Sequence, residues 1–262
     1  MNCKNCNKAL NNTQKFCDEC GAKVIQNRLT PKVIAAQVNE QFISIDNRFF
    51  RTFIDLFKKP GTVIDSYITG TRKKYIDVLQ YFAISLTLAG IQVFLMTTFF
   101  KEALVIDPEF MKTIESMPGQ DKNPMADFDF SFFTKYQGLI YIIGVPLSAI
   151  SSWLVYFFLG NRRYNFTEHL VLNLYYSAQI IIITAVLSIL FLVLGLNYLI
   201  LSSLIILPAF FYLGYVLKDV FKESHIETFA KFLLMMIIYA VIYMAVWIII
   251  FIILAFTGTI NI

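Results

Sequence analysis

Five long apolar segments without a single Asp, Glu, Lys or Arg constrain this chain more than any other feature. They cover residues 78–100, 138–159, 170–196, 198–217 and 232–256. A helix needs about 20 apolar residues to cross the hydrocarbon core of a bilayer, so each segment is long enough to span it. Charged residues make up only 15% of the chain, against about a quarter in a typical soluble domain. The sequence therefore predicts an all-α polytopic membrane protein with about five transmembrane helices, in a bundle over residues 78–262.

The distribution of Lys and Arg predicts the orientation, because cytosolic loops carry an excess of these residues. Three stretches hold 18 of the 22 basic residues: residues 1–77, the loop with Arg162 and Arg163, and the loop with Lys218, Lys222 and Lys231. The loop over residues 101–137 instead has seven acids and four lysines. Residues 1–12 contain no apolar stretch, so we expect no cleavable signal peptide. We expect an inner (cytoplasmic) membrane location, with the N-terminus in the cytosol and the C-terminus outside.

All four cysteines of the chain lie within residues 1–25, which we predict to form a zinc ribbon. They are spaced C-x2-C, ten residues, then C-x2-C-G: Cys3, Cys6, Cys17 and Cys20. Zinc favours four thiolates in a tetrahedron, and four protein ligands leave no open position for water or substrate. We therefore expect one structural zinc ion. Two disulfides are the alternative, but they rarely persist in a reducing cytosol; a redox switch that releases zinc is a further alternative.

The predicted ribbon has a mildly basic surface. Its lysines are balanced in part by Asp18 and Glu19, and it lacks the interleaved aromatic and basic residues of a nucleic-acid surface. We expect no nucleic acid, and a role in contacting a cytosolic protein or in bracing the terminus.

Residues 26–77 read as a linker followed by juxtamembrane helices. From Lys32 to Lys58 apolar residues recur every three or four positions, which predicts an amphipathic helix; they are Val38, Phe42, Ile45, Phe49, Phe53, Leu56 and Phe57. Such a helix can lie in the membrane interface or pack on the ends of the spans, and the two are compatible. Pro60 and Gly61 then break the chain before a short second helix.

Three cations precede the first predicted span: Arg72, Lys73 and Lys74. Their first interpretation is a positive-inside anchor, and the second is contact with phospholipid headgroups.

The run Pro60-Gly61-x5-Tyr67-x2-Gly70-x-Arg72-x2-Tyr75 follows Phe53-x2-Leu56 and a C-x2-C-G knuckle. Over about residues 1–100 this pattern resembles an uncharacterised bacterial family of zinc-ribbon integral membrane proteins. The five spans with the N-terminus inside also resemble Yip1-type membrane proteins. These resemblances imply architecture and location, and no activity.

The spans contain polar but no charged residues, which argues against a proton-coupled pump. Candidates for an intramembrane polar site are Gln92, Asn173 and Gln179; hydrogen bonding between helices is the alternative explanation. Glu168 and His169 precede the third span, and a solvated loop with an N-cap at Thr167 explains them without acid–base chemistry. We expect no enzymatic activity. The hypotheses are a membrane scaffold or sensor in contact with lipids or a cytosolic protein, or a channel, lipid-handling protein or transporter for neutral or amphipathic molecules, as a homo-oligomer.

Overall fold

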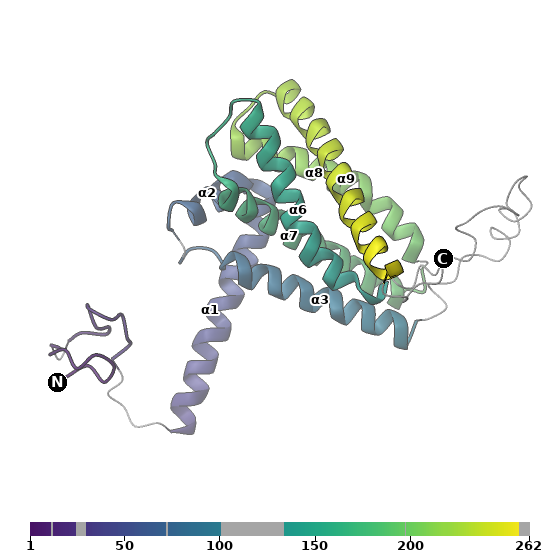
Figure 1. Cartoon of the computed structure of the whole chain (residues 1–262). Coiled ribbons are helices and arrows are strands. Elements are labelled where there is room, and N and C mark those ends of the chain that lie inside the picture. The colour runs from purple at the N-terminus through teal and green to yellow at the C-terminus, as the bar shows by residue number, and fades with distance from the viewer. Residues whose placement is uncertain (12, 25–29, 72, 101–133, 197, 257–262) are drawn as a thin grey trace, which may run out of the picture. The chain divides into compact units, whose positions relative to one another are not determined.

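A computed structural model describes residues 1–11, 13–24, 30–71, 73–100, 134–196 and 198–256, without the side chains of 34–46, 198–202 and 250–256. Within these ranges the only regular elements are helices (Figure 1): α1 (Pro31–Lys58), α2 (Pro60–Ile68), α3 (Val78–Thr98), α6 (Gln137–Phe158), α7 (Phe166–Val193), α8 (Tyr198–Phe221) and α9 (His225–Phe256). Arg72, the acidic loop over 101–133 and the side chains of Val38, Phe42 and Ile45 lie outside the described residues.

Five of the helices are long and apolar enough to cross a membrane: α3, α6 and α7, with residues 203–221 of α8 and 225–249 of α9. The chain is therefore a multi-pass membrane protein. Each predicted span falls on one of these helices, but three helices extend further at one end. The third begins at Phe166, the fourth continues to Phe221 and the fifth begins at His225. Lys218 and Lys231, which the sequence placed in a loop, therefore lie in helices.

The chain divides into two compact units, Met1–Asn47 and Arg48–Ile262. In the first, two short loops are closed by isolated bridges, one between Asn2 and Ala9 and one between Phe16 and Lys23. Cys3, Leu10 and Cys17 form its small buried core, with Ala22 and Val24 packed against them. So little apolar surface cannot hold a fold by itself.

In the second unit, α7 lies at the centre of the bundle and contacts α2, α3, α6 and α8. In the apolar, membrane-spanning part of α7, 39% of the residues are buried, against only 6% in that of α9. α9 contacts α6 and α8. Most of its described apolar side chains are exposed, among them Ile226, Phe229, Ile237, Val241 and Met244. The bundle is thus organised around α7, and lipid or another partner must cover α9.

The C-terminal part of α1 and the short helix α2 pack against the bundle. Thr52 and Leu56 are fully buried there, whereas Phe50, Ile54 and Phe57 remain exposed. This part of α1 therefore packs on the spans and also keeps an apolar edge free. Pro60 stands at the first position of α2, where its missing N–H and fixed φ suit a helix start.

Candidate functional site

The four cysteines predicted from the sequence come together in the structure. Their Sγ atoms all lie within 4.8 Å of one another. The Sγ atoms of Cys3 and Cys20 are 3.6 Å apart, as are those of Cys6 and Cys17. A tetrahedron with metal–sulfur bonds of about 2.3 Å has edges of about 3.8 Å, whereas a disulfide needs about 2.0 Å. The four thiols could therefore hold one metal ion, and they are free rather than paired in disulfides.

The ribbon is built from two copies of the same knuckle, displaced by 14 residues. In the first, the N–H of Asn7 donates to the carbonyl of Cys3 (2.9 Å); in the second, the N–H of Gly21 donates to Cys17 (2.9 Å). Both turn residues have positive φ, 60° for Asn7 and 70° for Gly21. The sequence identified only the glycine. Asn7 is its counterpart, because asparagine tolerates the left-handed region better than most residues.

Backbone amides face the sulfurs at the exposed end of each knuckle. A hydrogen bond from the backbone of Ala22, with others from the Asn5 side chain and the neighbouring thiol of Cys6, lowers the pKa of Cys20 to about 6. The lowered pKa favours the thiolate form of Cys20, which is the form that binds a metal. Four thiolates this close repel one another, and a bound dication relieves that repulsion.

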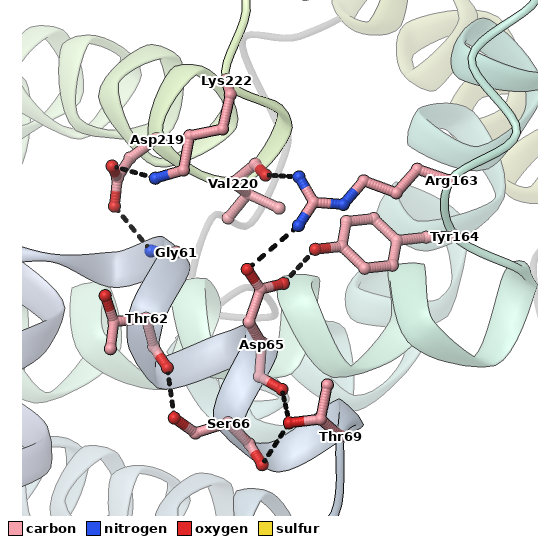
Figure 2. A network of polar contacts seen from close by, with 10 residues as sticks. All are labelled: Gly61, Thr62, Asp65, Ser66, Thr69, Arg163, Tyr164, Asp219, Val220 and Lys222. Atoms are coloured by element: carbon pink, nitrogen blue, oxygen red, sulfur yellow. Dashed lines mark hydrogen bonds and ion pairs between the residues drawn. The ribbon is translucent and has the colours of Figure 1, made fainter.

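A second polar cluster, which we call the mouth cluster, joins α2 to the loops at one end of the bundle (Figure 2). Asp65 of α2 accepts a hydrogen bond from Tyr164 and pairs with Arg163, whose Nη2 lies 3.1 Å from Oδ2. Arg163 also donates to the carbonyl of Val220 (2.8 Å). Burial, reinforced by the bond to Asp65, raises the pKa of Tyr164, so this phenol stays a donor. The mouth cluster therefore ties α2, the α6–α7 loop and the end of α8 together.

Asp219 of α8 completes the mouth cluster from the other side. Its Oδ2 accepts from the backbone N–H of Gly61 (2.8 Å), and its Oδ1 pairs with Lys222 (2.9 Å). The N–H of Gly61 belongs to the first turn of α2, where amides have no partner within the helix. A carboxylate from α8 thus caps α2. A Cβ on Gly61 would stand 2.6 Å from the Asp219 carbonyl oxygen, so only glycine fits this contact.

The end of α1 is held by side chains that reach its main-chain carbonyls. Gln179 of α7 donates to Phe53 O (3.2 Å), while Tyr212 and Tyr215 of α8 donate to the carbonyls of Leu56 (3.1 Å) and Lys58 (2.9 Å). Carbonyls in the last turn of a helix need partners from outside it. α1 is therefore anchored by its backbone.

The segment between α2 and α3 is fixed in the same way. Tyr75 donates to Asp55 (2.9 Å), and the N–H of Ile76 donates to Thr52 (3.0 Å). Burial, followed by the bond to Asp55, raises the pKa of Tyr75 to about 12. Lys73 and Lys74 are exposed beside this anchored segment, and Lys74 Nζ lies over the Tyr75 ring, 5.1 Å from its centroid. Their contact with headgroups stays a prediction.

The three predicted intramembrane polar residues are buried but do not form one site. Asn173 accepts from Ser148 (2.6 Å) and donates to Ser152 (3.0 Å). Gln179 instead bonds Tyr81 of α3 and the end of α1. Gln92 is 1% exposed and neither amide atom has a partner in the described part of the chain.

The interpretation of Glu168 and His169 as part of a solvated loop capped by Thr167 is wrong. Asn165 caps α7: its side chain accepts from the N–H of Glu168 (3.0 Å), and Glu168 accepts from the N–H of Asn165 (2.7 Å). This reciprocal pair is a capping box. His169 is only 1% exposed and its Nδ1 lies 3.1 Å from Ser152 Oγ.

Sequence reasoning also missed a buried charge cluster at the start of α9. The Nζ of Lys231 lies 2.6 Å from Glu223 and 2.7 Å from Glu227, and its side chain is 6% exposed. Asn161 of the α6–α7 loop donates to the same Glu223 oxygen (2.7 Å). The sequence signal for this cluster was the four-residue spacing of Glu227 and Lys231, which makes the two side chains neighbours on a helix.

Comparison with known proteins adds one match. The model of a family described as a protein of unknown function (DUF3667) matches residues 46–90. This stretch covers the anchored end of α1, all of α2 and the first half of α3, including Gly61 and Asp65. No curated protein and no solved structure matches the chain. The match thus includes the end of α1 and the start of α2, which side chains of α7 and α8 hold by their main-chain groups.

Proposed function

We propose that this protein is a non-enzymatic scaffold or sensor of the bacterial inner membrane, which couples a zinc ribbon to a membrane bundle. One observation carries the proposal. The single helix α1 begins at Pro31, eleven positions after Cys20, and its C-terminal end is anchored in the bundle by three main-chain carbonyls. A helix held at one end by the bundle is suited to transmit what the ribbon binds.

The metal of the proposed ribbon is zinc. Four thiolates at tetrahedral spacing are a donor set that zinc favours. The ion would complete a unit whose own core is too small to fold, so metal binding and folding would be one event. With four protein ligands the ion is structural, which is one reason to propose no catalysis.

The mouth of the bundle is proposed to face the cytosol. Three stretches rich in basic residues meet there: α2 and its flanks, the loop with Arg163, and the end of α8 with Lys222. The positive-inside rule assigns that side to the cytosol. The N-terminus is then cytosolic, and an odd number of spans puts the C-terminus outside.

The scaffold proposal is tested by comparing partners of the intact protein and a ribbon variant. Full-length protein and Cys6→Ser/Cys20→Ser would be cross-linked in cells, purified, and analysed for bound proteins and lipids. We expect at least one cytosolic protein that the intact ribbon retains and the variant loses. Lys15→Gln, an exposed change in the same ribbon, is the matched control. Identical partner sets for both proteins would refute the proposal.

A specific observation also supports the alternative, a channel, lipid-handling protein or transporter. A cavity of about 290 Å³ lies among α6, α7, α8 and α9. Most of its lining is apolar, and its hydroxyl-bearing residues are Tyr141, Ser148, Tyr176, Ser177, Tyr239 and Tyr243. Neutral or amphipathic solutes suit such a lining. Liposomes holding the purified protein would show flux that Ser148→Leu blocks; no flux of ions, solutes or labelled lipids would exclude this function.

A further inference from the structure

A second, larger hollow lies outside the clusters described above, between α8 and α9. This α8–α9 groove has a volume of about 560 Å³. Its walls are mostly apolar, and residues from α8 and α9 contribute to it: Leu207, Phe210, Phe211, Gly214, Phe229 and Phe232 among others. Because α9 is the least buried membrane helix, the groove faces the hydrocarbon region rather than the protein interior.

One end of the groove is basic. Lys218 and His225 line it, and their Nζ and Nε2 atoms lie 2.6 Å apart. The other lysines of this end are occupied: Lys222 pairs with Asp219, and Lys231 with two glutamates. In the described part of the chain no carboxylate pairs with Lys218. The groove therefore ends in a cationic group that is available to an anion.

An unpartnered buried hydroxyl also lines the groove. Thr228 is 4% exposed, and its Oγ1 has no hydrogen-bond partner within the described residues. It stands one turn along α9 from His225. Burying a hydroxyl without a partner costs free energy, and an oxygen-rich ligand at this end would satisfy it.

The length of the groove fits one leaflet. From Lys218 to Leu207 on one wall, and from His225 to Met236 on the other, the helices advance by about 16 Å at 1.5 Å per residue. Half of a hydrocarbon core of about 30 Å is about 15 Å. A ligand with an anionic head at Lys218 and an apolar tail along the groove would end near the middle of the bilayer.

We propose that the α8–α9 groove binds one anionic phospholipid. The phosphate accepts hydrogen bonds from the Lys218 ammonium and the Thr228 hydroxyl, and an acyl chain lies along the apolar walls past Gly214. His225 Nε2 accepts from Lys218 and thereby positions the ammonium. This site is separate from Lys73 and Lys74, and it does not depend on the scaffold function.

Native mass spectrometry of the full-length protein tests the site. Delipidated protein would be titrated with phosphatidylglycerol, and in parallel with phosphatidylcholine of the same chains. We expect one phosphatidylglycerol per chain to bind at least about tenfold more tightly, because the choline cation of the zwitterionic head offsets the phosphate charge and is repelled by the Lys218 ammonium.

Two variants locate the binding. Lys218→Gln/His225→Gln removes the basic end and should weaken phosphatidylglycerol binding about tenfold. Gly214→Leu fills the groove without a clash, since nothing lies within 4 Å of a Cβ there, and should abolish binding while keeping the helix. Lys222→Gln is the control: it removes the same charge four residues further along the chain, just past the end of α8, but its side chain is paired with Asp219. We expect its binding to be unchanged.

Three results would overturn the proposal. Equal binding of both lipids, or binding unaffected by Gly214→Leu, would mean that the groove does not select an anionic lipid. Inorganic phosphate that displaces the lipid and itself binds with similar affinity would identify a free-anion site. A dimer in which a second copy fills the groove, and which Gly214→Leu dissociates, would identify an interface.

Discussion

The cysteine ribbon and the mouth of the bundle hold their shapes by opposite means. The ribbon concentrates its stability in four side chains around one point, with a core of only Cys3, Leu10 and Cys17. At the mouth of the bundle, stability comes from many separate contacts, among them those of Gly61 with Asp219 and of Asp65 with Arg163. Loss of one ion should therefore collapse the first region completely, whereas single substitutions should weaken the second by degrees.

The largest effect is expected from Cys6→Ser with Cys20→Ser. Removing two of four ligands abolishes tight metal binding, and a unit that cannot fold without metal loses its structure. Bound zinc should fall from one ion per chain to none, and amide hydrogens of residues 1–24 should exchange at unfolded rates. The melting temperature of the membrane-spanning helices should stay the same, because the effect on the bundle is confined to residues 48–68. Persistent protection in the metal-free ribbon would show that its own core suffices.

Gly61→Ala should produce the next largest effect. The new Cβ would meet the Asp219 carbonyl at 2.6 Å, so α2 must move away from α8. Overpacking of this kind costs about 1–3 kcal/mol. Reversible unfolding in mixed detergent measures the loss. Gly90→Ala is the control, because nothing lies within 4 Å of a Cβ there, and a similar loss in both variants would refute the close contact.

Tyr164→Phe should cost about 1.5 kcal/mol, since a hydrogen bond to a carboxylate is removed and Arg163 remains to pair with Asp65. A double-mutant cycle with Asp65→Asn checks the assignment, because the two losses should not add. Strict additivity would mean that the hydroxyl and the carboxylate act independently.

The smallest expected effect is a dependence of the free energy of unfolding on pH. A free phenol ionises near pH 10, about two units below Tyr75 in the folded protein. The folded state therefore retains this proton longer, and its contribution to stability is complete below about pH 10 and is lost as the pH rises through about 12. Unfolding between pH 8 and 11 should show a steeper decline for the native chain than for Tyr75→Phe. Parallel curves would contradict the burial of this hydroxyl.

The same contrast explains what the sequence could predict. Long uncharged runs and four cysteines at fixed spacing are local signals. The structure has a helix at each predicted span and brings the four cysteines together, as expected. The ends of the helices were harder to predict, because a hydropathy pattern ends a span at the first charged residue even where the helix continues. The Lys231 side chain is buried in α9, and its ammonium pairs with Glu223. α9 therefore begins before the apolar run does.

Contacts between distant segments left no comparable signal. Gly61 and Asp219 are 158 positions apart, and nothing in either neighbourhood points to the other. His169 looked like a loop residue because Glu168 precedes it. Its burial follows from the capping box of Asn165, which starts α7 one turn before the apolar run.

Hydrogen exchange of the full-length protein in nanodiscs, with zinc and after chelation, tests the proposed coupling most directly. Loss of zinc should speed exchange not only in residues 1–24 but also in residues 48–68, where α1 and α2 meet the bundle. Lys15→Gln should behave like the unmodified chain. Exchange over residues 48–68 that is the same with and without metal would contradict the coupling of ribbon to bundle.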